Sequence, residues 1–204
     1  MSIRAFIALE LPQKCQDSLA SVQKQLAGVG KGVSWTRPEN IHLTLKFLGY
    51  VEEAQVEAAA AAMTAAAVGH GPLRLKMKGV GAFPGVARPR VIWVGVAGED
   101  VGRLVGLQRV LDARLAAVGS EKPEAKTYAP HLTLGRVKDP APVRGKSPLA
   151  DNSPLTKMIL SLAGLDLDEF EAAELVLFKS DLKPGGAVYT KLHAVRLLAA
   201  HEGG

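Results

Sequence analysis

The tetrapeptide His-Leu-Thr-Leu occurs twice in this chain, as His42-Leu43-Thr44-Leu45 and again as His131-Leu132-Thr133-Leu134. Only five His are present among 204 residues, so a chance repeat of His and Thr in one frame is improbable. Each copy lies in a run that is typical of a β-strand. Because side chains alternate between the two faces of a strand, the His and Thr of each copy should share one face, and the two Leu should point into a core.

Two such strands facing one cleft would supply two acid–base groups and two neutral hydrogen-bond donors. Imidazole titrates near neutrality, so one ring can donate a proton while the other accepts one. Threonine hydroxyls can donate hydrogen bonds to the non-bridging oxygens of a phosphate. The doubled motif therefore favours phosphate ester chemistry without a metal. The residues alone leave open which His is the acid and which is the base.

Composition sets broad limits on the class of protein. The hydrophobic content of 48% suffices for a core, and the net charge of +5 is compatible with either a solvated surface or a polyanionic partner. Cys15 is the single cysteine, which excludes an internal disulfide and a cysteine-based metal site. The N-terminus has no signal-peptide pattern, and the Ala-rich run 58–67 is too short to span a membrane. We therefore expect a cytoplasmic protein without membrane association.

Hydrophobic periodicity predicts an α+β protein. Expected strands cover 3–9, 33–48, 73–77, 91–96, 131–134, 174–178 and 188–197, and expected helices cover 12–26, 52–68, 101–118 and 155–165. A Gly/Pro loop is expected over 79–89 and an exposed loop over 138–154. Each half of the chain thus has a helix, a His-Thr strand and further strands. We therefore expect an α+β protein with internal pseudo-duplication.

Other kinds of site fit the sequence less well. Two His with no carboxylate or Cys inside either motif give too few metal ligands, and Asp139 after the second motif has no counterpart near the first. No Gly-x-Ser-x-Gly elbow, P-loop or complete Gly-x-Gly-x-x-Gly is present. We expect neither a metal nor another cofactor.

Basic residues surround both motifs. Arg88 and Arg136 are candidates for phosphate contact, because a guanidinium offers two donors to one phosphate. Arg136 follows Thr133 by three residues, so a regular strand would turn it away from the His-Thr face unless a strand end or bulge redirects it. Lys46 and Lys138 are interpreted as exposed, solubilising charges.

The scarce aromatic residues could offer a stacking face for a base. Phe83, in the expected Gly/Pro loop, is the best stacking candidate, and Tyr128 is a second candidate for substrate contact. Phe47 and Trp93 are expected to pack in the core. His193 is interpreted as a structural residue, and His70 and His201 as surface residues.

The doubled motif resembles that of the 2H phosphoesterase superfamily. Several stretches in order look like the bacterial and archaeal RNA 2′,3′-cyclic phosphodiesterases, also called 2′-5′ RNA ligases: 4–9, 37–49, 81–84, 88–93, 130–136 and 174–180. The resemblance covers nearly the whole chain. It implies a two-lobed, pseudo-duplicated fold, in which each lobe is an antiparallel-rich sheet with helices packed outside. The two interleaved lobes would form a single domain over 1–204, with a His-x-Thr from each lobe facing a central cleft.

The resemblance also implies an activity, namely metal-independent hydrolysis of a terminal 2′,3′-cyclic phosphate to a 2′-phosphomonoester. Carried over by position, His42 is the proton donor to the departing 3′-oxygen, His131 is the proton acceptor that activates water, and Thr44 and Thr133 hold the phosphate. The expected partner is RNA with a cyclic phosphate end, or a cyclic nucleotide, bound by a monomer. Two alternatives stay open: 2′-5′ ligation or cleavage of 2′-5′ linkages, and a non-catalytic nucleotide- or RNA-binding module.

Overall fold

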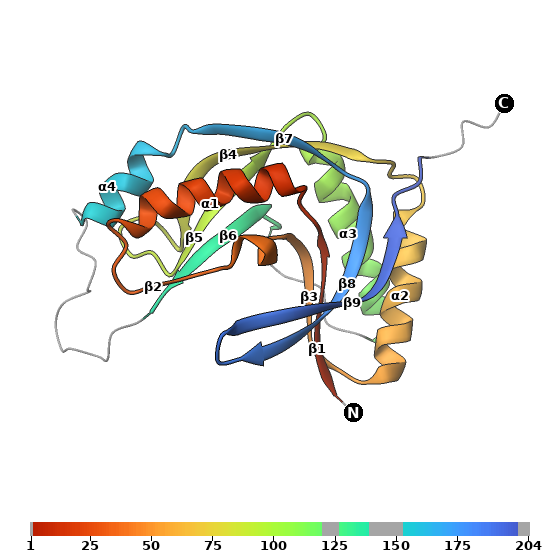
Figure 1. The fold of residues 1–204 in the computed structure, drawn as a ribbon. Coiled ribbons are helices and arrows are strands. Elements are labelled where there is room, and N and C mark those ends of the chain that lie inside the picture. Colours follow the sequence, from red (N-terminus) through yellow and green to blue (C-terminus); the bar gives the residue numbers. More distant parts are fainter. Residues whose placement is uncertain (1, 120–126, 139–152, 200–204) are drawn as a thin grey trace.

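The fold is built on one long, curled antiparallel sheet flanked by helices (Figure 1). The computed structural model describes residues 2–119, 127–138 and 153–199. The strands are β1 (Ile3–Leu9), β2 (Val33–Trp35), β3 (Leu43–Val51), β4 (Leu73–Phe83), β5 (Val91–Ala97), β6 (His131–Val137), β7 (Asp166–Ala172), β8 (Glu174–Lys183) and β9 (Gly186–Arg196). Their order in the sheet is β7-β4-β5-β6-β3-β1-β8-β9, and β2 pairs with β6.

The sheet divides into two halves at the motif strands. β3-β1-β8-β9 form one half and β6-β5-β4-β7 form the other, and β3 and β6 are joined by the single pair Leu43↔Leu132. These two leucines occupy the same position in the two copies of the tetrapeptide. An antiparallel bridge between equivalent residues relates the two motifs by a local pseudo-twofold axis. The predicted α+β, two-lobed and pseudo-duplicated fold is thereby confirmed.

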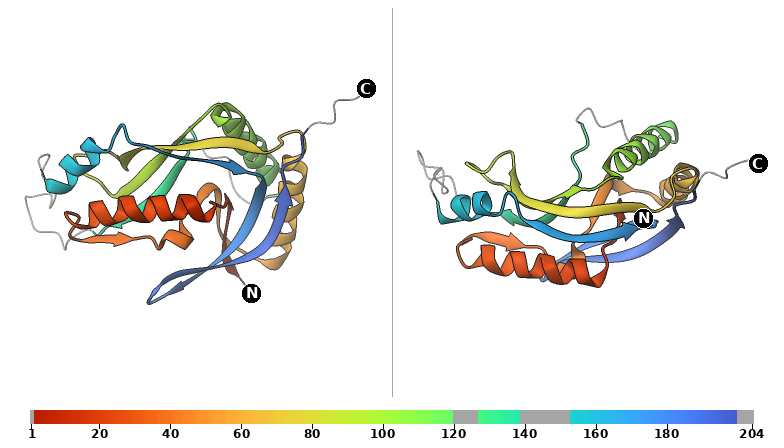
Figure 2. Two further views of the ribbon diagram at one scale, coloured as in Figure 1. Left: turned by 45° about the horizontal axis from the view of Figure 1, so that its top comes forward. Right: turned by 90° about the horizontal axis from the view of Figure 1, so that it is seen from above.

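Four α-helices lie in the described part of the chain: α1 (Gln13–Ala27), α2 (Glu53–Ala67), α3 (Val101–Ala117) and α4 (Pro154–Ser161). α2 and α3 lie together at one end of the molecule, and α1 and α4 lie at the other (Figure 2). α1 forms where Cys15, Leu19, Val22 and Leu26 fall at helical spacing, and all four are buried. Gln23 of α1 ties the helix to the sheet by donating to the carbonyl of Leu134 at 2.8 Å.

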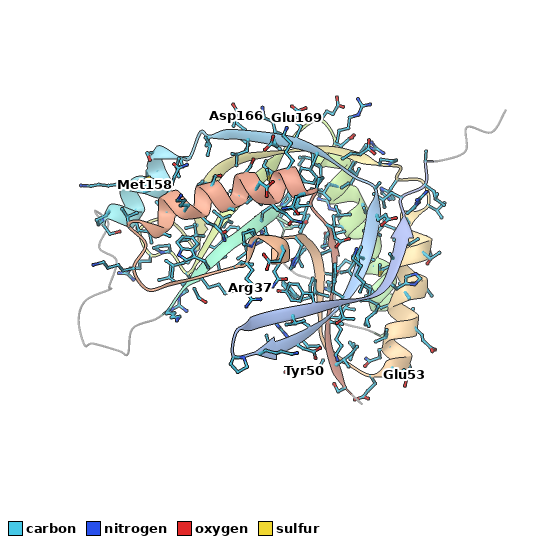
Figure 3. All side chains as sticks on the ribbon, in the orientation of Figure 1. Arg37, Tyr50, Glu53, Met158, Asp166 and Glu169 are labelled. Carbon is cyan, nitrogen blue, oxygen red and sulfur yellow. The ribbon has the colours of Figure 1, made fainter. Side chains whose placement is uncertain are left out.

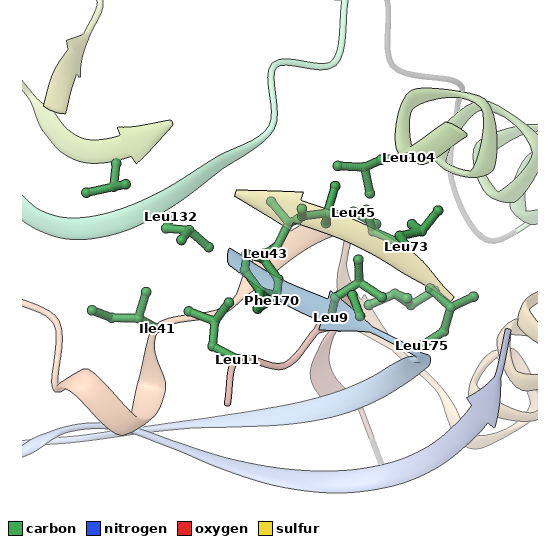
Figure 4. Packing of buried hydrophobic residues seen from close by; sticks show 14 of the residues in the cluster. Leu9, Leu11, Ile41, Leu43, Leu45, Leu73, Leu104, Leu132, Phe170 and Leu175 are labelled. Atoms are coloured by element: carbon green, nitrogen blue, oxygen red, sulfur yellow. The ribbon is translucent and has the colours of Figure 1, made fainter. Parts of the chain in front are cut away.

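The leucines of both motifs point into the core, as their alternation predicts. Leu43, Leu45, Leu132 and Leu134 are each at most 2% exposed and belong to one buried cluster with residues of α1, α2 and α3. Figure 4 shows Leu43, Leu45 and Leu132 in this cluster together with Leu104 of α3. Burying this face leaves the His and Thr of each motif for the opposite face of the sheet.

Three boundaries differ from the expectation. The predicted loop over 79–89 starts too early, because β4 continues to Phe83: Gly79 adopts a positive φ of 70° at a register shift and lets the strand pass through a bulge. The stretch 33–48 is not continuous, since the 3₁₀ turn η1 (Pro38–Asn40) separates β2 from β3. The strand β7 was not expected at all. The predicted loop over 138–154 lies almost entirely outside the described residues.

Candidate active site

The two motifs meet across the central bridge of the sheet. Leu43 lies opposite Leu132 in antiparallel register. One residue away from this pair on either side, His42 therefore lies across from Thr133, and Thr44 lies across from His131. All four side chains are half-buried, in contrast to the buried leucines between them. The His-Thr pairs that stand 89 residues apart in the chain therefore share one face at the centre of the sheet.

Both imidazoles are anchored in the same way. Nδ1 of His42 lies 2.8 Å from the carbonyl oxygen of Asn40, and Nδ1 of His131 lies 2.8 Å from the carbonyl oxygen of Ala129, two residues earlier in each case. Since a carbonyl oxygen only accepts, Nδ1 must carry the hydrogen in both rings. Nε2 is then left as the titrating atom, able to accept a proton when the ring is neutral and to donate one when it is charged.

The surroundings of the two rings differ. His42 stacks on Phe6 with ring centroids 4.6 Å apart, and Tyr189 meets it edge-on at 5.4 Å. Burial in this aromatic setting lowers the pKa of His42 to about 4, although the hydrogen bond from Nδ1 to Asn40 acts in the opposite direction. His131 contacts one aromatic ring, Phe83, edge-on at 4.9 Å.

The lowered pKa of His42 gives a prediction for stability. As pH falls from about 6.5 to 4, the unfolded chain takes up a proton at His42 and the folded protein does not, so folding loses free energy. The wild type should lose up to about 3 kcal/mol more stability over this range than His42→Gln. Denaturant unfolding of both proteins at several pH values measures the difference. A difference that stays constant across the range would show that His42 is not desolvated.

A bulge directly after the Thr changes the alternation in both motif strands. Ala8 pairs with Thr44 but Ile7 pairs with Lys46, so Leu45 is an extra residue in β3. Trp93 pairs with Thr133 but Ile92 pairs with Gly135, so Leu134 is the corresponding extra residue in β6. After an extra residue, each following side chain of the strand points to the face opposite to the one that simple alternation assigns. The residue three positions after each Thr is thereby brought to the His-Thr face.

Arg136 is one of the two residues that the bulges redirect. It lines the same cavity as Thr133, so the redirection that the sequence left open does occur. Gly135 lies on the opposite, buried face, where a Cβ atom would come within 2.9 Å of the Trp35 and Val33 side chains. A glycine at this position lets β2 pack against β6 and fixes the strand from which Arg136 projects.

Phe47 is the other redirected residue, and its predicted place in the core was wrong. Its side chain is 51% exposed and lines the cavity beside Thr44. The prediction that Lys46 is an exposed charge was also wrong, for the same reason. Lys46 is 5% exposed, and its Nζ lies 2.6 Å from Oδ1 of Asp112 in α3. A simple period of two assigns both residues to the wrong face.

A cavity of about 210 Å³ lies over this face of the sheet. Four of the residues predicted from sequence line it: His42, Thr44, Thr133 and Arg136. Sequence reasoning missed several others, among them Arg4, Asn40, Phe47, Ser180 and Tyr189. They come from β1, η1, β3, β8 and β9, and pairing between strands distant in sequence brings them together.

The remaining predicted residues are His131, Phe83, Tyr128 and Arg88, and they lie outside the lining of this cavity, although His131 stands across from Thr44 in the sheet. Phe83 is the last residue of β4 rather than a loop residue, and it packs between His131 and Trp93, with ring centroids 4.9 and 5.2 Å away. Tyr128 donates from its hydroxyl to the carbonyl oxygen of Thr44 at 2.9 Å, and burial raises the pKa of that hydroxyl. Arg88 is exposed in the turn between β4 and β5.

The hairpin of β8 and β9 is held against η1 at the rim of the cavity. Arg37 donates to the carbonyl of Gly185 at 2.9 Å, and Asn40 donates to the carbonyl of Ala187 at 2.9 Å. Figure 3 shows the Arg37 side chain in the space between η1 and this hairpin. These contacts place Tyr189 of β9 against His42.

The described residues provide neither a metal-binding cluster nor a membrane-spanning helix. Over residues 2–119, 127–138 and 153–199, no group of three or more His, Cys, Asp or Glu side chains is placed to hold a metal ion. In the same part of the chain, no helix is long and apolar enough to cross a membrane.

Comparison with known proteins identifies the family. The profile of the family described as LigT like Phosphoesterase matches residues 9–93. The RNA 2′,3′-cyclic phosphodiesterase of Methanothermobacter thermautotrophicus is 34% identical over 197 residues, which cover 97% of this chain and 100% of that protein. The protein of the same name from Methanocaldococcus jannaschii is 33% identical, over 92% of this chain and 96% of that one.

Solved structures agree on the fold. The structure of TT0787 from Thermus thermophilus superposes with a TM-score of 0.77 at 29% identity, covering 98% of this chain and 100% of that one. Escherichia coli LigT gives a TM-score of 0.69 at 21% identity, over 97% and 99%. The chain belongs to the LigT-like phosphoesterases of the 2H superfamily. It is a phosphoesterase whose relatives are named RNA 2′,3′-cyclic phosphodiesterases.

Proposed function

We propose that this protein hydrolyses the 2′,3′-cyclic phosphate at the end of an RNA and leaves a 2′-phosphomonoester. The observation that carries the proposal is the pseudo-twofold pair of imidazoles, each with Nδ1 fixed on a carbonyl and Nε2 left for proton transfer. Curated relatives that match over nearly the whole chain bear the name of this activity. The family resemblance of the sequence implies which bond of the cyclic phosphate breaks, namely the one from phosphorus to the 3′-oxygen.

The reaction needs one acid and one base. In the proposed mechanism, Nε2 of His131 accepts a proton from water, and the resulting hydroxide attacks phosphorus. The bond from phosphorus to the 3′-oxygen breaks, and Nε2 of His42 gives that oxygen its proton. Thr44 and Thr133 donate hydrogen bonds to the non-bridging oxygens, whose negative charge Arg136 also faces. The assignment of acid and base follows the resemblance.

The low pKa of His42 constrains this assignment. A ring with a pKa of about 4 is neutral in the empty site at neutral pH and cannot donate. The charge of a bound phosphate opposes the effect of burial, because a unit charge at about 4 Å contributes about 4 kcal/mol at an effective dielectric constant of about 20. That interaction is sufficient to bring the pKa of the imidazolium near neutrality. We propose that His42 becomes an acid only when substrate is bound.

This coupling can be measured directly. In an NMR titration of the empty protein, His42 should titrate near pH 4, and with the 2′-phosphate product bound it should titrate near neutrality. The pH profile of kcat/KM should accordingly show an inflection near pH 4 that the profile of kcat lacks, since kcat/KM reports the free enzyme and kcat the complex. A His42 pKa that stays near 4 with product bound would exclude His42 as the acid.

The activity itself is tested with a nucleoside 2′,3′-cyclic phosphate and an oligonucleotide ending in one, in buffer with EDTA. We expect hydrolysis at the same rate with and without chelator, because the proton transfers and charge contacts proposed here need only side chains. Chromatography against 2′- and 3′-phosphate standards identifies the product. Loss of turnover in EDTA with recovery on adding a divalent ion would disprove metal independence, and a 3′-phosphate product would reverse the proposed cleavage direction.

A further inference from the structure

We infer that Arg4 and Ser180 form a second anion subsite, which holds the phosphate on the 5′-oxygen of the terminal nucleoside. The inference rests on the proposed function and extends it from the reacting phosphate to the next one along the strand. That second phosphate is an internucleotide diester in RNA and a monoester in a 5′-phosphorylated mononucleotide.

The subsite is a row of polar side chains across three neighbouring strands. Ala5 pairs with Lys179, so Arg4 of β1 lies across from Ser180 of β8, and its Nη1 donates to the Ser180 hydroxyl at 3.4 Å. Ser180 in turn pairs with Tyr189 of β9. All three members of the row line the cavity that His42, Thr44 and Thr133 also line.

The row carries positive charge without a carboxylate to balance it. Within the described residues, neither Arg4 nor Arg136 has a carboxylate within ion-pair distance, whereas Arg74, Arg103 and Arg196 each do. Burial raises the pKa of the Tyr189 hydroxyl, and the charges of Arg4 and Arg136 both act to lower it. Both guanidinium groups therefore lie near this one hydroxyl, and an anion in the cavity would face both.

The position of Arg4 fits a phosphate other than the reacting one. Arg4 lies two residues before Phe6, on which His42 stacks, and side chains two residues apart on a strand are separated by roughly 7 Å. One nucleotide of a single strand can span that separation. A guanidinium with an adjacent hydroxyl offers the charge and the hydrogen-bond donors that a phosphate oxygen accepts.

The experiment compares three substrates: adenosine 2′,3′-cyclic phosphate, its 5′-phosphorylated form, and the dinucleotide ApA ending in a 2′,3′-cyclic phosphate. Each is assayed with the wild type, Arg4→Gln, Arg4→Lys and Ser180→Ala. The matched control is Arg196→Gln, which removes the same charge from an 82% exposed side chain outside the cavity. Thermal melting of each variant establishes that it is folded.

Arg4→Gln should raise KM for the dinucleotide about 10- to 100-fold, as expected for losing a hydrogen bond to a charged group. Both constants for adenosine 2′,3′-cyclic phosphate, which has no 5′-phosphate, should change far less than those for the dinucleotide, and the Arg4→Lys variant should fall between the wild type and Arg4→Gln. The slope of log affinity against log salt should fall by about 0.7 for the dinucleotide, the value for one phosphate contact on a single strand. An effect on the 5′-phosphorylated mononucleotide as large as that on ApA would show that any 5′-phosphate ester suffices.

Equal losses of Arg4→Gln on all three substrates would overturn the inference, because Arg4 would then act on the reacting phosphate or on the fold. A rise in KM of the same size in Arg196→Gln would also overturn it, because the effect would then come from net charge alone. If the wild type turned over none of the substrates, the proposed function would fail instead. Calorimetry of adenosine 2′-phosphate and ApA 2′-phosphate binding to the wild type and Arg4→Gln would then test the subsite without turnover. Weaker binding of ApA 2′-phosphate alone in Arg4→Gln would support the subsite. Equal binding of both ligands to the two proteins would refute it.

Discussion

Replacing either motif histidine by alanine is expected to lower kcat by about 10²- to 10⁴-fold, the range for losing a general acid or base. Thr44→Ala and Thr133→Ala should cost about 10- to 100-fold, because each removes one hydrogen bond to a charged group. Steady-state hydrolysis of a nucleoside 2′,3′-cyclic phosphate measures these effects. His70→Ala, outside the cavity, serves as the matched control and should behave as the wild type.

The leaving group separates the two histidine roles. A phosphodiester with a p-nitrophenolate leaving group needs no proton donor, so loss of the acid should matter much less with it than with the natural 3′-oxygen. His42→Ala should therefore recover most of its activity on such a substrate, and His131→Ala should not. Recovery by His131→Ala instead would exchange the two roles. A folded variant lacking both histidines that kept the wild-type rate would place the active site elsewhere.

The sequence predicted the centre of this site because the motif depends on local alternation. His42 and Thr44 share a face, as do His131 and Thr133, whatever else the strands do. The alternation failed one residue later, at Lys46 and Phe47. The extra residue in each motif strand reverses the faces, and Leu45 gives no sign of it.

The periphery of the site depends on pairing between distant strands. Ser180 and Tyr189 reach the cavity because β8 pairs with both β1 and β9, and no local pattern encodes this register. Tyr128 likewise acts through the backbone of Thr44, 84 residues away. Gly79 misled the prediction for β4 because a glycine with positive φ can mark either a turn or a bulge inside a strand. Residues fixed by one strand were therefore predictable, and residues fixed by register were not.

Asp112→Ala is expected to lower the free energy of unfolding by about 3–5 kcal/mol, the range for removing one partner of a buried ion pair. The Lys46 and Asp112 side chains are only 4% and 13% exposed, and 2.6 Å separates their charged atoms. The Lys46 ammonium would lose this carboxylate while staying in the interior, on the strand that carries Thr44. Denaturant unfolding with an unchanged m-value gives the free energy.

Two comparisons isolate the buried pair as the cause. Lys46→Met/Asp112→Leu should recover most of the lost stability, because replacing both partners of a buried pair by apolar side chains leaves neither charge in the interior. Glu174→Ala, which breaks the exposed pair with Arg196, should cost less than about 1 kcal/mol. If Asp112→Ala cost no more than Glu174→Ala, the bulge would not hold Lys46 in the interior. The bulge at Leu134, which carries Arg136 to the His-Thr face, is tested independently by Arg136→Ala. This variant should bind phosphate more weakly than the wild type if Arg136 faces the site.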